Sequence, residues 1–156
     1  MLRLVMFSVL ILTGAVAAQD ANTPDLSGNW VIQADVDAAR NRRPINGVSI
    51  ATELVIRQAP REVTMQTNTG TGGTTVTTTH KLDGSEYEIE GPIGWGTRAR
   101  ARWEGATFAV DIRRSVQGPQ GELVFDIQER YTRADDTLTL VRTLGRTTQT
   151  LLYQLR

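Results

Sequence analysis

The side chains that could carry out chemistry are few in this sequence and widely spaced. There is no Cys, and His80 is the only His among the 156 residues. A zinc site needs three or four His, Cys or carboxylate ligands, which a single His cannot anchor. The serines after residue 18 fall in expected turns or at strand ends without a nucleophile-elbow motif, and they are Ser27, Ser49, Ser85 and Ser115. Neither nucleophilic catalysis nor a bound metal or other cofactor is expected.

Two sets of alternating charges resemble a catalytic carboxylate cluster but have a simpler interpretation. Glu86, Glu88 and Glu90 recur at every second residue, as do Arg98, Arg100 and Arg102. In a strand, such spacing places each set on one face. Solvated cross-strand ion pairs contribute only ~0.2–1 kcal/mol each, so we expect these charges to set strand register and solubility.

The glycine-rich segment 69–75 is not a phosphate-binding loop, because neither a Lys nor a helix follows it. We expect a flexible hairpin tip there. The segment 35–49 also interrupts the strand pattern. Asp37 could cap a turn of helix through Arg40, and residues 40–43 form either a solvated loop or a basic lid at the mouth of a barrel.

The first 18 residues have the pattern of a secretory signal peptide. Arg3 provides the positive start, an apolar run follows, and Val16-Ala17-Ala18 is a small-residue cleavage motif. The apolar run is shorter than the ~20 residues of a membrane-spanning helix, which disfavours an uncleaved anchor. We expect residues 1–18 to be removed, residues 19–24 to be a flexible leader, and the protein to be bacterial and periplasmic or secreted.

Composition limits the partners of the mature chain. Loss of Arg3 leaves 16 basic against 17 acidic side chains, a net charge of −1. Such a chain has no overall field that would attract nucleic acid or an anionic membrane. We therefore expect no nucleic-acid partner and no stable membrane insertion after signal cleavage.

From the turn before Trp30 onward, the chain reads as one continuous series of short strands. Trp30, Ile32 and Ala34 share a face of the first strand, and turn residues then recur at short intervals. About ten strands at this spacing indicate an all-β barrel or sandwich. We predict an antiparallel up-and-down barrel of about 8–10 strands over residues 25–156.

Strand register can be predicted from the turns. A two-residue turn at Asp83-Gly84 pairs His80 with Tyr87, and a hairpin centred on Gly94 pairs Tyr87 with Ala101. A turn at Glu104-Gly105 then pairs Ala101 with Phe108 and Ala99 with Val110. This register points the apolar residues inward and the Glu/Arg ladder outward; the inward set continues with Ile112, Leu123, Phe125 and Ile127.

The last two turns bring an ion pair onto the inward face. A turn at Asp135-Asp136 pairs Glu129 with Arg142 and Tyr131 with Leu140. A turn at Gly145-Arg146 then pairs Arg142 with Gln149, Leu140 with Leu151 and Leu138 with Tyr153. Desolvation cancels much of the attraction in a buried ion pair, so the presence of this pair requires another reason.

An outer-membrane barrel is the alternative for a meander after a signal peptide. Such barrels have an apolar exterior and aromatic girdles. Aromatic residues make up only 6% of this chain, and that arrangement would put the Glu/Arg ladder in lipid. A water-soluble barrel is the better interpretation.

Three features together resemble the calycin group, which comprises the lipocalin-like and fatty-acid-binding-like barrels. Gly28-Asn29-Trp30 matches the Gly-x-Trp of the first lipocalin strand. Residues 79–84 and 102–108 are similar to hairpins of fatty-acid-binding proteins and of small exported bacterial lipocalin-like domains, and Tyr153 lies on the closing strand. The resemblance covers residues 25–156. It implies a closed barrel around a small hydrophobic molecule, usually without catalysis.

The chain also departs from these families. Fatty-acid-binding proteins have an Arg two residues before the closing Tyr, where this chain has Leu151. Arg142, the only inward Arg in the predicted register, either replaces that carboxylate anchor or is neutralised by Glu129. In lipocalins an Arg packs over the Gly-x-Trp tryptophan; Arg156 and Arg142 are candidates, and we favour Arg156. Segment 35–49 is short for a two-helix lid.

Three functions remain open from the sequence. The first is binding of a small hydrophobic or amphipathic molecule, with a carboxylate-bearing molecule as one option. The second is a structural or interaction protein with a packed interior. The third is a calycin-type isomerase or lyase with Glu129 or His80 as base; haem ligation by His80 is less expected than a hydrogen bond within the barrel. The predicted ligand-binding residues are His80, Tyr87, Ala99, Ala101, Phe108, Val110, Glu129, Tyr131, Leu140, Arg142, Gln149 and Tyr153, and Gly28, Trp30 and Arg156 are predicted to close the barrel.

Overall fold

The computed structural model describes residues 23–37, 49–68, 75–91 and 94–156. The predicted signal peptide, most of the leader, the helical turn after Asp37, the basic residues 40–43 and the glycine-rich tip lie outside these ranges. The described residues form ten strands: β1 (Gly28–Asp35), β2 (Glu53–Ala59), β3 (Glu62–Asn68), β4 (Thr75–Lys81), β5 (Tyr87–Glu88), β6 (Gly96–Glu104), β7 (Thr107–Gly118), β8 (Gly121–Ala134), β9 (Thr137–Leu144) and β10 (Thr147–Leu155).

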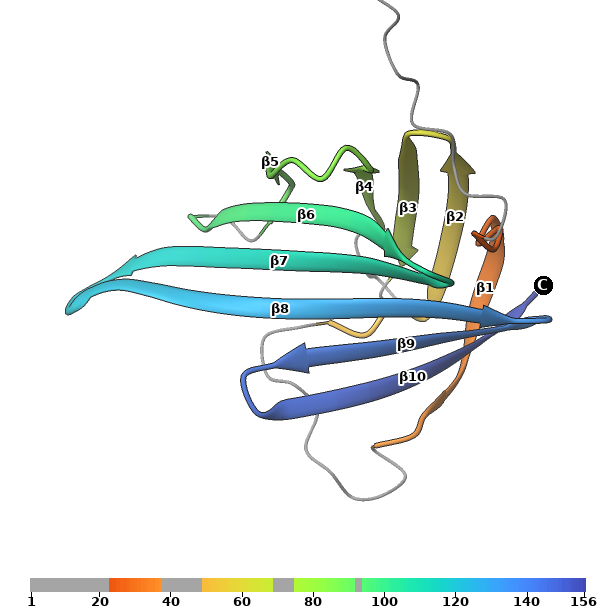
Figure 1. Ribbon diagram of the computed structural model, residues 1–156. Coiled ribbons are helices and arrows are strands. Elements are labelled where there is room, and N and C mark those ends of the chain that lie inside the picture. Colours follow the sequence, from red (N-terminus) through yellow and green to blue (C-terminus); the bar gives the residue numbers. More distant parts are fainter. Residues whose placement is uncertain (1–22, 38–48, 69–74, 92–93) are drawn as a thin grey trace, which may run out of the picture.

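The strands form one antiparallel sheet that curls into a nearly closed barrel (Figure 1). Their order is β4-β3-β2-β1-β10-β9-β8-β7-β6-β5, so each strand pairs with its neighbour in sequence and β1 pairs with the last strand. Closure is incomplete because the sheet has its two edges at β4 and β5. The predicted all-β barrel is thus confirmed. Within the described ranges, no helix is long and apolar enough to cross a membrane.

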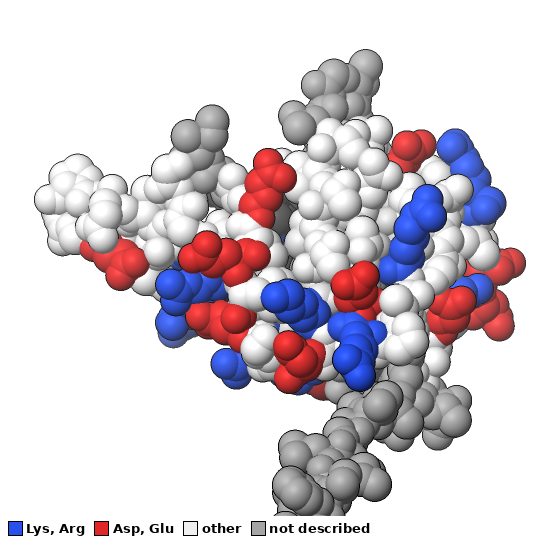
Figure 2. All heavy atoms as spheres, turned by 90° about the horizontal axis from the view of Figure 1, so that it is seen from above, with Lys and Arg blue, Asp and Glu red and all other residues white. Residues whose placement is uncertain are grey.

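Period-two alternation separates the inside of the barrel from its surface. In β6, Ala99 and Ala101 are buried, whereas Arg98 and Arg100, which alternate with them, are exposed. Charges of both signs therefore alternate over the outer face (Figure 2). On this outer face, Arg102 forms an ion pair with Asp111 at 2.5 Å, and Arg130 contacts the same carboxylate at 3.0 Å.

The register predicted for the last three strands is confirmed. Glu129 pairs with Arg142 between β8 and β9, and Arg142 pairs with Gln149 between β9 and β10. Trp30 pairs with Leu155, which joins β1 to β10. Tight two-residue turns leave little freedom for slippage, and so the β8–β9 and β9–β10 pairings follow directly from the turn residues.

Two earlier hairpins have the predicted facing but a register shifted by two residues. Tyr87 pairs with Ala99, and Ala101 pairs with Val110. Gly105 has φ +60° and occupies the turn, so the β6–β7 turn is Gly105-Ala106 and not Glu104-Gly105. A two-residue shift leaves every side chain on the same face, which explains why alternation alone could not exclude it.

The predicted hairpin at Asp83-Gly84 is wrong. No ladder joins β4 to β5 among the described residues. Instead, the Asp83 carboxylate accepts hydrogen bonds from the backbone N–H of Ser85 at 2.9 Å and from its hydroxyl at 2.6 Å. Gly84 has φ +75°, and this local turn directs the following residues away from pairing with β4. His80 and Tyr87 still meet, but only through their side chains.

Beyond the barrel, the ends of β7 and β8 project as a two-stranded ribbon (Figure 1). Leu123 and Phe125 were expected inside, yet they are 52% and 38% exposed. The alternation predicts their side correctly, but β9 ends at Leu144, opposite Ile127. From Ile127 back to the ribbon's turn before Gly121, β8 lies beyond the end of β9, so its side chains there do not face the barrel interior.

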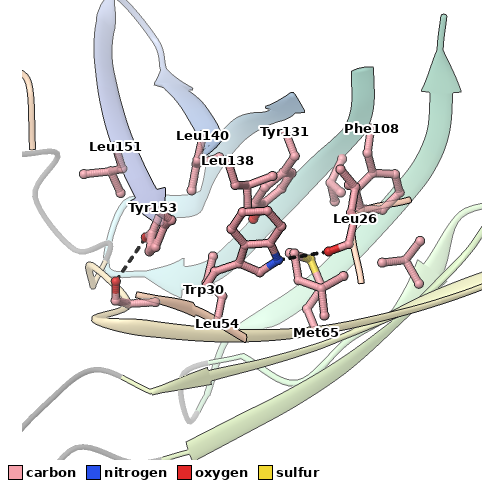
Figure 3. Close-up of a cluster of buried hydrophobic side chains, with 14 of the residues drawn as sticks. Leu26, Trp30, Leu54, Met65, Phe108, Tyr131, Leu138, Leu140, Leu151 and Tyr153 are labelled. Atoms are coloured by element: carbon pink, nitrogen blue, oxygen red, sulfur yellow. Dashed lines mark hydrogen bonds between the residues drawn. The ribbon is translucent and has the colours of Figure 1, made fainter. Parts of the chain in front are cut away.

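The opposite end of the barrel is closed by Trp30, which is fully buried (Figure 3). Its indole N–H donates to the Leu26 carbonyl at 2.9 Å. Gly28 has φ +153°, a backbone conformation that residues with a Cβ rarely adopt, and a Cβ there would also require the end of the Leu155 side chain to move, so the entry beneath Trp30 favours glycine. The predicted closure role of Gly28 and Trp30 fits this geometry.

A different arginine from the one predicted covers the tryptophan. The Arg133 guanidinium lies 5.3 Å from the Trp30 ring centroid and donates to the Asp25 carbonyl at 2.5 Å. Arg156 instead points to the surface and contacts Glu53 at 3.4 Å. Arg133 reaches Trp30 because it continues the inward face of β8 to the closed end of the barrel, whereas Arg156 lies past the end of β10.

Candidate ligand-binding site

The barrel interior gathers all the residues predicted for the site. Each is buried except Tyr87, which is half-buried. The pairings place several of them in one layer around the barrel wall, running from β6 to β10 through Ala101, Val110, Glu129, Arg142 and Gln149. Small and apolar residues thus occupy one side of this layer, and polar residues occupy the other.

The centre of the polar side is the buried ion pair of Glu129 and Arg142. Arg142 Nε donates to Glu129 Oε1 at 2.7 Å, and the Tyr131 hydroxyl donates to Glu129 Oε2 at 2.7 Å. Arg142 Nη1 also reaches the Ser49 carbonyl at 3.4 Å. Both carboxylate oxygens are therefore engaged by donors from the barrel wall.

These partners keep the pair ionised despite its burial. Burial on its own would raise the pKa of Glu129, but the Arg142 guanidinium and the Tyr131 hydroxyl hold it below its usual value. The pKa of Arg142 is raised, because the Glu129 carboxylate outweighs the effect of burial. Burial raises the pKa of Tyr131 well above its usual value, so this hydroxyl keeps its proton.

His80 bridges the gap between the sheet edges from inside. Its Nδ1 lies 2.8 Å from the Tyr87 hydroxyl, and its ring packs edge-on against Phe108 with centroids 5.9 Å apart. Burial lowers the pKa of His80 to about 4, although the Glu129 carboxylate works in the opposite direction. His80 is therefore a neutral wall residue at pH 7, as the hydrogen-bonded interpretation predicted.

Gln149 and Tyr153 complete the wall on β10. Gln149 donates through Nε2 to Asp35 at 2.7 Å, while its Oε1 is buried without a hydrogen-bond partner among the described residues. The Tyr153 hydroxyl donates to the Ala51 carbonyl at 3.0 Å, fixing the segment before β2 against β10 (Figure 3).

Sequence reasoning missed a second inward arginine. Arg114 continues the inward face of β7 after Val110 and Ile112. Its Nε is buried and has no hydrogen-bond partner among the described residues. Burial lowers the pKa of Arg114, and both Glu129 and Arg142 act on it electrostatically, so the three groups share one interior. Extending the alternation one step past Ile112 would have found it.

Arg114 changes the charge of the site. The prediction that Arg142 is the only inward arginine is wrong, for Arg133 closes one end and Arg114 faces the interior near the other. Around the polar layer, strands β7 to β10 present the two guanidinium groups of Arg114 and Arg142 to the single carboxylate of Glu129. Neutralisation of Arg142 by Glu129 therefore leaves one interior guanidinium uncompensated by these strands.

The interior is densely filled towards the closed end. Trp30, Phe108, Leu138 and Tyr153 are all fully buried and belong to one continuous cluster (Figure 3). Two hollows, of about 620 Å³ and 570 Å³, lie on the outside of the barrel near the projecting ribbon. Among the described residues, no group of His, Cys, Asp and Glu side chains could hold a metal ion.

Comparison with known proteins identifies the fold. Neither protein-family models nor curated protein sequences match this chain. Solved structures do: the REP1-NXSQ fatty acid transporter has a TM-score of 0.61 at 15% identity, covering 84% of this chain and 96% of that one. The fluorescent protein UnaG has a TM-score of 0.62 at 16% identity, covering 84% of this chain and 97% of UnaG. Apo lipid binding protein 8 of Caenorhabditis elegans has a TM-score of 0.61 at 9% identity, covering 83% of this chain and 94% of that protein.

These likenesses establish a class of fold. The chain has the calycin β-barrel fold of fatty-acid-binding and lipocalin-like proteins, as the Gly-x-Trp strand and the meander predicted. Identities of 9–16% carry the fold and not a particular ligand.

Proposed function

We propose that the protein binds a small amphipathic molecule inside the barrel, with its acidic group directed toward Arg114 and Arg142. The neighbours in structure include a fatty acid transporter and a lipid binding protein, which supports hydrophobic ligand binding for a barrel of this kind. The pattern of an apolar interior with a few orienting polar groups is typical of small-molecule sites.

The observation that carries the proposal is the pair of inward arginines, buried Arg142 and half-buried Arg114. A buried guanidinium nitrogen without a hydrogen-bond partner is costly, and ligand binding is one reason for a protein to retain it. Arg114 Nε has no partner among the described residues, and neither does Gln149 Oε1 on β10. A ligand carboxylate would supply the missing acceptor for Arg114.

Two neighbouring arginines provide a matched test. Arg114 faces the interior, whereas Arg113 points outward with its side chain 62% exposed and contacts Asp126 at 3.1 Å. Oleate and its methyl ester would be titrated into the protein, each competing with a fluorescent apolar probe. We expect Arg114→Leu to weaken oleate at least tenfold relative to the ester, and Arg113→Leu to change neither. Equal losses for acid and ester would remove Arg114 as the anchor.

Arg142→Leu is a less clean test of the same site. That substitution leaves the Glu129 carboxylate without its cation and so perturbs the whole interior. Native mass spectrometry of protein purified without delipidation is the complementary experiment. We expect a bound small molecule at one-to-one stoichiometry, and a bare protein mass in every preparation would contradict the proposal.

A scaffold without ligand is the second candidate function. The observation that favours it is the dense cluster around Trp30 and Tyr153, together with hollows that lie outside the barrel. In that case the Glu129–Arg142 pair serves only to fix the register of β8 and β9. Absence of any bound molecule, with no response to either oleate or its ester, would support this alternative.

We also place this function outside the cytoplasm, in the periplasm or the medium. The signal-like sequence of residues 1–18 is the supporting observation. Binding, not catalysis, is the proposed role: the lowered pKa of about 4 makes His80 a weak base, and its Nδ1 is engaged with the Tyr87 hydroxyl. N-terminal sequencing of the exported protein would test cleavage near Ala18.

A further inference from the structure

The projecting ribbon leaves part of β8 unpaired on one side. β8 runs from Gly121 to Ala134, but β9 pairs only with Ile127–Ala134. Residues 121–126 therefore have β7 on one side and no strand on the other within the described part of the chain. The N–H and C=O groups along such an edge can pair with an additional strand.

The side chains along this edge are apolar on both faces. Leu123, Val124 and Phe125 are 52%, 45% and 38% exposed, and they are the large exposed hydrophobic residues of the described ranges. Consecutive residues of a strand point to opposite faces, so the ribbon has apolar surface on each side. Native edge strands are usually protected by charge, proline or a bulge; here the charges of Glu122 and Asp126 only flank the three apolar residues.

A hollow lies where an additional strand would continue the line of β9. It has a volume of about 570 Å³ and is lined by Val124, Phe125, Asp126, Gln128, Thr143, Leu144 and Gly145. β9 stops at Leu144, and the β9–β10 turn forms one wall of the hollow. The space is therefore bounded by the unpaired backbone of β8 on one side and by this turn at its end.

We propose that a second copy of this chain occupies the edge, its β8 adding antiparallel to the first about a twofold axis at Val124. In this register, Leu123 lies opposite Phe125 of the second copy, and the reverse contact forms by symmetry. Residues 122–126 of each copy pair, which is the length that β9 leaves available. The ribbon turn of the second copy then enters the hollow beside Gly145.

The charges of the outer face agree with this register. Arg113 binds Asp126 through Nε at 3.1 Å, and its side chain is 62% exposed. The second copy's Glu122 would lie directly opposite Asp126. A guanidinium has five N–H donors, so the terminal nitrogens of Arg113 can also bind that second carboxylate. Without this arginine, two acids opposite each other would oppose pairing.

A second copy fits better than a membrane surface. The apolar residues lie along the side of the ribbon, while its extremity carries Gln117, Gln120 and Glu122. The end of the ribbon shows few charges but is a narrow lobe (Figure 2). An interface of five paired residues per copy falls below the ~1,200 Å² of stable complexes, so we expect a reversible dimer. This interface is independent of any ligand inside the barrel.

Sedimentation velocity over a concentration series would test self-association. We expect the mature chain to pass from monomer to dimer at high micromolar concentration, and Val124→Lys to shift the midpoint at least tenfold by placing two like charges at the twofold axis. Thr77→Lys is the matched control, because it adds the same charge to an exposed strand position on the far edge of the sheet. A monomer at all concentrations would overturn the proposal.

A cysteine scan provides a positive readout that does not depend on disrupting the fold. The chain has no native Cys, so a single substitution reports one contact. Directly opposed residues have Cβ atoms ~4.5–5.5 Å apart, within easy reach of disulfide geometry. We expect mild oxidation to cross-link Val124→Cys into a dimer and to leave Thr77→Cys monomeric. A dimer that Val124→Cys does not cross-link would exclude this interface, and so would binding of lipid vesicles through Leu123 in a protein that stays monomeric.

Discussion

The two ends of the barrel interior use arginine in opposite ways. At the closed end, Arg133 lies over Trp30 and donates to the Asp25 carbonyl, while its side chain keeps contact with solvent. Towards the other end, Arg142 is 7% exposed and is held by Glu129. A half-exposed guanidinium seals a hydrophobic floor at little desolvation cost, whereas a buried one adds little net stability. The difference separates residues that stabilise the barrel from residues that are retained for another purpose.

The largest expected effect lies at the closed end. Trp30→Ala removes a fully buried indole, its hydrogen bond to Leu26 and the surface under Arg133. Loss of a buried Trp typically lowers the free energy of unfolding by roughly 3–5 kcal/mol. Urea denaturation would measure it, with Trp95→Ala as the control, because Trp95 is half-exposed and packs mainly on Phe125. If the two substitutions cost the same, Trp30 is not the closure of the barrel.

The polar interior should respond differently to single and double substitution. Arg142→Leu strands the Glu129 carboxylate in the core and should lower the free energy of unfolding by roughly 3 kcal/mol or more. Replacing both residues by Leu removes the stranded charge, and we expect most of that loss to be recovered. A double-mutant cycle from denaturation curves would measure the coupling. Additive losses would mean that the coupling energy between Glu129 and Arg142 is zero, and would contradict the stranded charge as the cause of the single-mutant loss.

The sole histidine makes the polar interior sensitive to mild acid. Burial lowers the pKa of His80 from 6.5 to about 4, so below pH 6.5 the unfolded chain binds a proton that the folded chain does not. The part of the free energy of unfolding that depends on His80 being neutral is therefore present above pH 6.5, and it is lost as the pH falls toward 4. We expect a loss of about 2 kcal/mol between pH 7 and pH 5, measured by denaturation at each pH.

His80→Gln is the control for this pH dependence. Gln keeps a polar group that can meet Tyr87 but does not titrate, so the profile between pH 7 and pH 5 should flatten. The lowered pKa of Glu129 adds a further loss of stability in more acidic solution, below its ordinary value of 4.5. A wild-type profile that stays flat down to pH 5 would show that His80 is not desolvated.

What could be predicted from the sequence follows from the physics of strands. Alternation assigns the face of a residue, and tight turns such as Asp135-Asp136 assign its partner, so the Glu129–Arg142 pair can be predicted from the sequence. Around longer or glycine-rich connections, a two-residue shift in strand register leaves every side chain on the same face, so alternation cannot reveal it. The pairing of Tyr87 with Ala99 is one such case.

Alternation also cannot say where the barrel ends. Phe125 follows the inward pattern but lies past the end of β9, in the ribbon. Arg114 follows the same pattern on β7 but stays within reach of the interior. The relative lengths of neighbouring strands decide between these outcomes, and those lengths depend on tertiary packing. The arginine over Trp30 was missed for a related reason: Arg133 reaches it because β8 extends fully to the closed end.

The smallest effect distinguishes the two arginines that compete for Trp30. Arg133→Ala removes a cation over the indole face and a hydrogen bond to the Asp25 carbonyl, which together should lower the free energy of unfolding by about 1 kcal/mol. Arg156→Ala should stay within about 0.5 kcal/mol, because its side chain is 71% exposed and makes one surface ion pair.

The tryptophan itself supplies a second readout for this pair. Removal of Arg133 opens the floor of the barrel beside the indole, so quenching of Trp30 fluorescence by acrylamide should increase. Trp95→Phe and Trp103→Phe would be introduced first, because the chain has three Trp and the signal must come from Trp30 alone. In that background Arg156→Ala should leave quenching unchanged. An increase with Arg156→Ala and none with Arg133→Ala would restore the lipocalin-like arrangement that the C-terminal position of Arg156 first indicated, and would place the seal outside the barrel wall.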